Sequence, residues 1–165
     1  MKIDRIWAMP NKWTFTIKPI RELLKQEIEG GVWLDPFAGF NSPAQETNDL
    51  DITSPAKYHL GALEFVKKYK DKSIDGVLYD PPYSITQARM YGKKEFSSMK
   101  YWADVKNELA RVLKPGGKAI CFGWSSMGLG KNRGFEMTKI LLVPHGGSKN
   151  DTICTVERKI QDKLF

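Results

Sequence analysis

The sequence has few of the residues that build disulfide frameworks or metal centres. It contains two cysteines, Cys121 and Cys154, and two histidines. This excludes a disulfide-rich fold and leaves too few ligands for a typical zinc site. Both cysteines lie in apolar stretches, where we expect buried, reduced thiols. We therefore expect no metal site.

Long hydrophobic runs are also absent. No apolar stretch approaches the roughly 18 residues that a membrane-spanning helix requires, and the charged residues after Met1 are not typical of a secretory signal peptide. Low-complexity linkers and internal repeats do not occur. We expect a cytoplasmic protein with no membrane partner and with a single domain over residues 1–165. The 12% aromatic content excludes disorder as the main state.

Charge is distributed unevenly along the chain. The net charge is +7 overall, −3 over residues 35–83 and +8 over residues 84–165. A basic half beside an acidic middle favours a polyanionic partner, such as nucleic acid, that meets one side of the molecule. A lysine-rich surface in contact with water is the alternative explanation.

Segments typical of helices and strands alternate, which predicts an α/β fold with a mostly parallel sheet. The last two strands are joined by a connection too short for a parallel crossover, so we expect an antiparallel strand near the C-terminal end. Helical periodicity covers 20–29, 60–70 and 97–113, and the predicted strands are 32–34, 44–48, 74–79, 119–124, 140–143 and 152–156.

The segment Asp80-Pro81-Pro82-Tyr83 directly follows one predicted strand. Because proline lacks an N–H and restricts the residue before it, this segment is stiff and offers only acceptors, the Asp80 carboxylate and the Pro81 carbonyl. These acceptors match an amino group with two N–H donors, and the carboxylate would stabilise positive charge that develops on its nitrogen. Tyr83 offers a flat face for stacking a base. A simple turn is the alternative.

The sequence resembles the Rossmann-type S-adenosylmethionine-dependent amino-methyltransferases that form N6-methyladenine, in a small form without a target-recognition domain. Asp80-Pro81-Pro82-Tyr83 matches the catalytic motif of this family and residues 35–39 (Asp-Pro-Phe-Ala-Gly) match its cofactor motif. Residues 114–117 and 14–19 resemble two further segments of the family. The resemblance implies a seven-stranded sheet with one antiparallel strand and helices on both faces.

The resemblance also implies site residues. The family binds S-adenosylmethionine, and the matching cofactor positions are Thr14, Phe15, Thr16, Asp35, Pro36, Phe37, Gly39, Asp49 and Leu50. The implied catalytic residues are Asp80, Pro81, Pro82 and Tyr83. Two departures weaken the match: Gly61 replaces an acidic residue that the family often has near the cofactor adenine, and the spacing between Asp35 and Asp49 is short.

Residues outside these motifs are candidates for contacts with the acceptor. Arg89, Lys93 and Lys94 lie in a basic segment that we expect to meet phosphates, and Asn150 of the last hairpin would reach the base. Ordinary surface loops are the alternative for both segments. Trp124 is expected in the core and His145 as an ordinary loop residue.

Together these features predict methyl transfer from S-adenosylmethionine to the N6 amino group of adenine in DNA. The same chemistry on RNA stays open, because the acceptor loop recognises an amino group and not the sugar. A catalytically silent, nucleic-acid-binding subunit is a further alternative, favoured by the two departures. A homodimer or a specificity partner is possible on this interpretation.

Overall fold

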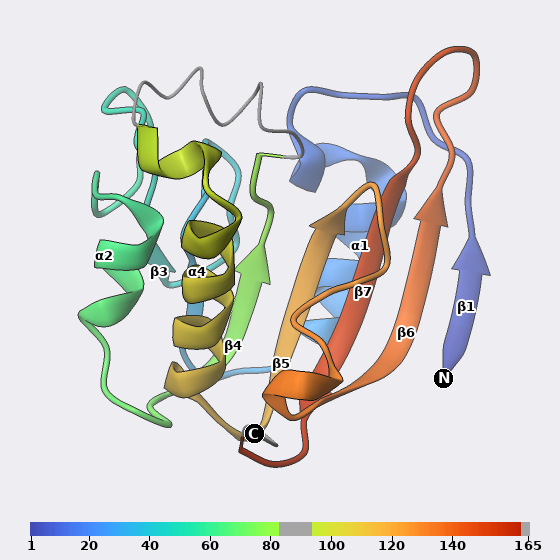
Figure 1. The fold of residues 1–165 in the computed structure, drawn as a ribbon. Coiled ribbons are helices and arrows are strands. Elements are labelled where there is room, and N and C mark those ends of the chain that lie inside the picture. Colours follow the sequence, from blue (N-terminus) through green and yellow to red (C-terminus); the bar gives the residue numbers. More distant parts are fainter. Residues whose placement is uncertain (83–93, 163–165) are drawn as a thin grey trace.

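The computed structural model describes residues 1–82 and 94–162, which form one twisted sheet with helices against it (Figure 1). The helices are α1 (Lys18–Glu27), α2 (Ala62–Lys67) and α4 (Met99–Val112), with short 3-10 turns η1 (Thr14–Thr16), η2 (Lys94–Ser97) and η3 (Lys131–Arg133). The strands are β1 (Lys2–Arg5), β2 (Trp33–Asp35), β3 (Glu46–Thr47), β4 (Ile74–Tyr79), β5 (Leu113–Gly123), β6 (Phe135–Val143) and β7 (Thr152–Lys159).

The sheet confirms the predicted fold class. Its order is β1-β6-β7-β5-β4-β2-β3, and every neighbouring pair is parallel except the two that involve β7. From β2 the chain proceeds to β3 on one side and then returns to β4 on the other side. In such sheets, ligands bind outside the carboxyl ends of the strands at the point where the order reverses.

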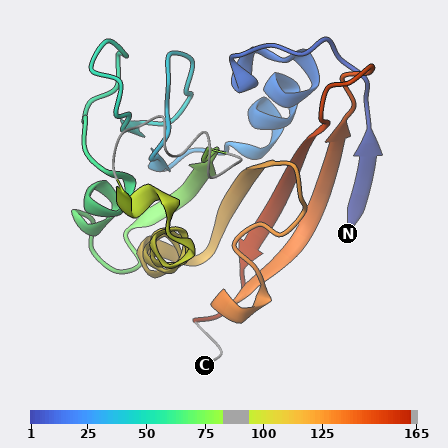
Figure 2. The same ribbon diagram turned by 45° about the horizontal axis from the view of Figure 1, so that its top comes forward.

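Helices cover both faces of the sheet (Figures 1 and 2). On one face Ile20, Leu23 and Leu24 of α1 are buried in one apolar cluster with Leu78 and Ile120 of the sheet. Their spacing follows the helical period, which is why this segment forms an amphipathic helix. α2 and α4 pack on the other face around a second cluster. None of the helices in the described part of the chain is long and apolar enough to cross a membrane.

Several elements differ from the sequence prediction, among them β6, which begins at Phe135 although the prediction began this strand at residue 140. β1 was not predicted, because its residues are mostly exposed and pair only along one edge of β6. β3 is only two residues long. β5 begins at Leu113, directly after α4, although the prediction began this strand at Ala119. Segment 114–117 bulges out within β5, since Ile74 pairs with Leu113 whereas Gly76 already pairs with Lys118.

A methyl group on Gly76 is expected to destabilise the centre of the sheet. Gly76 of β4 lies opposite Trp33 of β2, and a Cβ here would overlap the Trp33 ring. Because Trp33 is buried, the ring has no space to move into, and Gly76→Ala should lower the free energy of unfolding by about 1–3 kcal/mol.

Gly123→Ala is the matched control, because the nearest atom to its Cβ would be 4.0 Å away. We expect it to change stability by less than about 0.5 kcal/mol. Urea unfolding of both variants checks the comparison, and equal destabilisation would contradict it.

Candidate functional site

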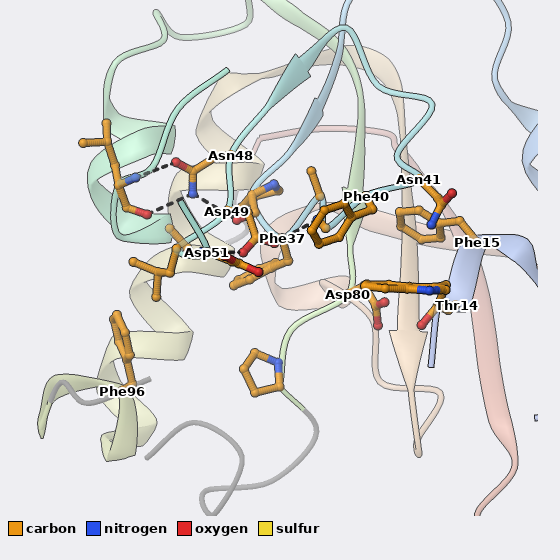
Figure 3. A pocket seen from close by; sticks show the side chains of 18 of the residues that line it. Thr14, Phe15, Phe37, Phe40, Asn41, Asn48, Asp49, Asp51, Asp80 and Phe96 are labelled. Atoms are coloured by element: carbon orange, nitrogen blue, oxygen red, sulfur yellow. Dashed lines mark hydrogen bonds between the residues drawn. The ribbon is translucent and has the colours of Figure 1, made fainter. Parts of the chain in front are cut away.

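Two cavities lie at the carboxyl edge of the sheet. The first, of about 300 Å³, is enclosed by the segments that follow β2, β3 and β4, by α4 and by residues 12–15 (Figure 3). The second, of about 880 Å³, lies between residues 10–17, the end of β5 and the β6–β7 hairpin. Asp80 and Pro82 line both cavities, so the predicted catalytic segment stands at their boundary.

The Asp35 carboxylate holds the loop that follows β2. It is fully buried, accepts the Ser42 hydroxyl at 2.6 Å through Oδ2 and accepts the Phe37 N–H at 2.9 Å through Oδ1. Burial, with a smaller contribution from the nearby Asp80 and Asp49 carboxylates, raises the pKa of Asp35 to about 7 against the lowering effect of these two hydrogen bonds. Asp35, a predicted cofactor residue, lines neither cavity and affects the first one only through the loop that it holds.

Asn48 and Asp49 connect this loop to the segment after β3. The buried Asn48 side chain donates to the carbonyls of Pro36 and Leu60 at 3.1 and 3.0 Å. Asp49 accepts the Gly39 N–H at 2.8 Å through Oδ2, and the Asp51 N–H at 2.8 Å through Oδ1. Gly39 has φ of +52°, a conformation that glycine adopts without steric cost. The two loops thus form one hydrogen-bonded wall.

An aromatic wall closes the opposite side of the first cavity. Phe96 of η2 and Tyr101 and Trp102 of α4 line it, and the Trp102 ring lies 5.9 Å from the Phe37 ring. Sequence analysis did not identify these residues as part of the site. The periodicity over 97–113 predicts a helix here, and nothing in the sequence indicates that the apolar face of this helix continues into a cavity.

The first cavity is acidic. Asp49, Asp51 and Asp80 line it, and Lys12 is the one Lys or Arg among its lining residues in the described part of the chain. Asp80 follows β4 directly, where Pro81 and Pro82 stiffen the backbone. Pro81 lines only the second cavity. The arrangement favours a cationic ligand in the first cavity and a hydrogen-bond donor beside Asp80.

Trp124 and His145 differ from the sequence interpretation. Trp124 lines the second cavity and is 47% exposed, so it does not belong to the core. His145 is buried, with Nδ1 2.9 Å from the Ala8 carbonyl and Nε2 2.8 Å from Thr152 Oγ1. Since a carbonyl only accepts, Nδ1 carries the proton and Nε2 accepts from Thr152. His145 thus ties the N-terminal segment to β7.

The other predicted site residues divide into three groups. Within the first cavity lie Thr14, Phe15, Pro36, Phe37, Gly39, Asp49 and Leu50, and Asn150 lies in the second. Thr16 and Lys94 line neither cavity, and the Thr16 hydroxyl donates to the Trp13 carbonyl at 2.8 Å. Tyr83, Arg89 and Lys93 lie outside the described residues.

The described part of the chain contains no group of side chains suited to bind a metal ion and no exposed cysteine. No cluster of three or more His, Cys, Asp or Glu side chains that could bind a metal ion occurs there. Cys121 and Cys154 are free and buried, and burial raises the pKa of both thiols far above the ordinary value. Both are therefore held as neutral thiols in the core, as the sequence predicted.

The sheet order, the single antiparallel strand and the cavity at the switch point define a methyltransferase-like α/β fold. No protein-family model matches the sequence, and no curated protein matches it. Solved structures do match in fold, at identities of 18% or below in the examples that follow.

Three solved structures illustrate the likeness. TrmN from Thermus thermophilus aligns at TM-score 0.59 and 18% identity over 87% of this chain and 49% of TrmN, so the chain spans about half of that protein's length. The 1,6-didemethyltoxoflavin-N1-methyltransferase of Burkholderia thailandensis was solved with 1,6-didemethyltoxoflavin and S-adenosylhomocysteine. It aligns at TM-score 0.62 and 13% identity over 86% of this chain and 76% of its own. A SAM-dependent methyltransferase from Methanosarcina mazei aligns at TM-score 0.54 and 12% identity over 85% of this chain and 98% of its own.

Asp35 is expected to make stability depend on pH. Its pKa is about 7 in the fold against an ordinary 3.8, so between these values the folded state keeps a proton that the unfolded chain releases. Stability from this group therefore falls as pH rises through that window, with a slope of at most about 1.4 kcal/mol per pH unit.

Asp35→Asn tests this expectation, because the amide oxygen can still accept the Phe37 N–H. Urea unfolding at a series of pH values should show the variant gaining stability relative to the wild type from pH 4 to 7, the window of the Asp35 titration. Parallel pH profiles for the two proteins would show that Asp35 does not titrate in this range.

Proposed function

We propose that the protein transfers a methyl group from S-adenosylmethionine to the N6 amino group of adenine in DNA. The observation that carries this proposal is the position of Asp80 and Pro82 at the boundary of the two cavities. A reaction between two bound molecules requires both to reach one point, and holding them there supplies much of the rate acceleration.

The first cavity fits the cofactor in charge and shape. Its three carboxylates suit a ligand that carries a sulfonium and an ammonium group. Gly39 leaves open space where a Cβ would stand, so the backbone can approach the ligand closely. The half-buried Asp49 has lone pairs left beyond its two backbone hydrogen bonds, and we assign them to the ribose hydroxyls.

Gly61 does not weaken this fit. Leu60 and Ala62 on either side of it line the cavity, so the wall at this point is apolar and suits the face of an adenine ring. The Leu60 N–H and carbonyl are both bonded to Asn48, which fixes the wall in place. Gly61 has no side chain, and the contact of this apolar wall with an adenine ring does not require one.

The acceptor chemistry rests on Asp80 and Pro81. Both line the second cavity, and both offer acceptors, so they can hold the two N–H groups of an exocyclic amine with its lone pair facing the first cavity. The bound cofactor supplies an electrophilic methyl group. As the amine attacks, positive charge develops on its nitrogen, and the Asp80 carboxylate stabilises that charge.

Replacing Asp80 is expected to slow transfer strongly, with a smaller effect on cofactor binding because Asp49 and Asp51 still line the first cavity. Asp80→Ala should lower kcat by about 10²–10³-fold, the usual cost of removing one electrostatic contact in the transition state. Asp71→Ala is the control, since Asp71 is exposed and pairs with Arg111 away from the site.

The measurement is transfer of tritiated methyl groups to single- and double-stranded DNA and to matched RNA, followed by mass analysis of the nucleosides. N6-methyladenine in DNA supports the proposal. Methyl incorporation into RNA but not into DNA would show that RNA is the substrate. Wild-type rates for Asp80→Ala would overturn the role of Asp80.

Asp49 is expected to contribute to cofactor affinity. Asp49→Asn keeps the shape of the side chain but loses its charge and one of the two oxygens that accept backbone N–H groups. We expect the dissociation constant of S-adenosylmethionine to rise about 10-fold. Calorimetry measures both proteins, with Asp71→Asn as the control. An unchanged affinity in Asp49→Asn would contradict the assignment of the ribose hydroxyls to this carboxylate.

A further inference from the structure

Two large aromatic side chains are exposed beside the second cavity. Trp124, at the end of β5, is 47% exposed and lines it. Trp7, which follows β1, is 59% exposed and lies against the β6–β7 hairpin, where a Cβ on Gly146 would be 3.3 Å from its Nε1. Exposed indole faces beside a cavity are features of a binding surface rather than of the core.

Two lysines lie on the surface beside these tryptophans. Lys12 and Lys149 line the second cavity, and Asp80 is its one carboxylate among the described residues. Asp151 is exposed nearby in the same hairpin. Basic side chains beside aromatic faces are the combination that binds the phosphates and bases of single-stranded nucleic acid.

The N-terminal segment is fixed against the hairpin. The Ile6 N–H donates to the Leu142 carbonyl at 2.9 Å and the Ala8 N–H to the Pro144 carbonyl at 3.1 Å, which continues the pairing of β1 with β6. His145 joins Ala8 to Thr152 from the other side. The backbone on both sides of Trp7 is therefore fixed against the hairpin.

We propose that the surface formed by Trp7, Lys12, Trp124 and Lys149 binds unpaired, single-stranded nucleic acid. This inference rests on the proposed function and specifies the state of its substrate. Bases next to the target stack on Trp124 and Trp7, and Lys12 and Lys149 contact the phosphates. In a duplex each base is already stacked, so its faces are not available to the tryptophans and the target must first be unstacked.

The test measures binding without turnover. Fluorescence anisotropy follows a labelled, adenine-containing DNA strand of about 12 nucleotides, a length within the usual range of single-strand sites, and the corresponding duplex, both with S-adenosylhomocysteine present. We expect the single strand to bind about 10-fold more tightly than the duplex. Equal or tighter binding of the duplex would overturn the inference.

Variants locate the surface. Trp124→Ala and Trp7→Ala should each weaken single-strand binding about 10-fold. Lys149→Gln should make the slope of log affinity against log salt concentration shallower by about one, the loss of one phosphate contact. Met127→Ala is the control, because Met127 is 75% exposed and lines neither cavity. Circular dichroism confirms folding. Wild-type affinity in both tryptophan variants would overturn the inference.

Failure of the inference and failure of the proposed function are distinguishable. Tryptophan-dependent binding of the strand without methyl transfer supports the surface and counts against the proposed activity. Formation of N6-methyladenine in duplex DNA at equal rates in the wild type and in both tryptophan variants supports the activity and overturns the surface.

Discussion

The site depends on carboxylates that bind backbone N–H groups rather than cations. Asp35 holds the loop after β2 through the Phe37 N–H and the Ser42 hydroxyl, and Asp49 holds Gly39 of the same loop from the segment after β3. Without these contacts the loop N–H groups would face a cavity with no partner. Hydrogen bonds to an ionised carboxylate are about twice as strong as neutral ones, so the negative charge of Asp49, which lines the first cavity and suits the proposed cofactor, also organises the wall around it.

The core of the fold could be predicted because its segments carry strong local signals. Ile74–Tyr79 has apolar residues at four of its six positions and is bounded by Ser73 and Asp80, and β4 has these limits. α1 follows from its apolar spacing, and the antiparallel β7 follows from a connection too short for a crossover. Burial determines these elements, and burial leaves a clear pattern in the sequence.

The remaining elements depend on contacts between distant segments. β1 is mostly exposed and exists because β6 offers it an unpaired edge. The bulge in β5 forms opposite Asp75, whose carboxylate accepts the Lys114 ammonium at 2.7 Å. In the site, the resemblance implied Asp35 and Asp49, and position directly after a strand identified Asp80. It gave no indication that Trp124 would be half exposed or that His145 would bind two other segments.

The antiparallel strand explains how a small sheet gains a second cavity. Since β7 runs opposite to its neighbours, a short hairpin at the carboxyl edge beside Asp80 joins it to β6, whereas a parallel strand would require a long crossover to the other edge of the sheet. β7 also holds the segment after β5, because the buried Glu157 accepts the N–H groups of Leu129 and Gly130 at 2.6 and 3.0 Å. The segments on both sides of the second cavity are therefore anchored to one strand. That common anchor keeps Trp124 and the hairpin in register with the acceptor groups of Asp80 and Pro81.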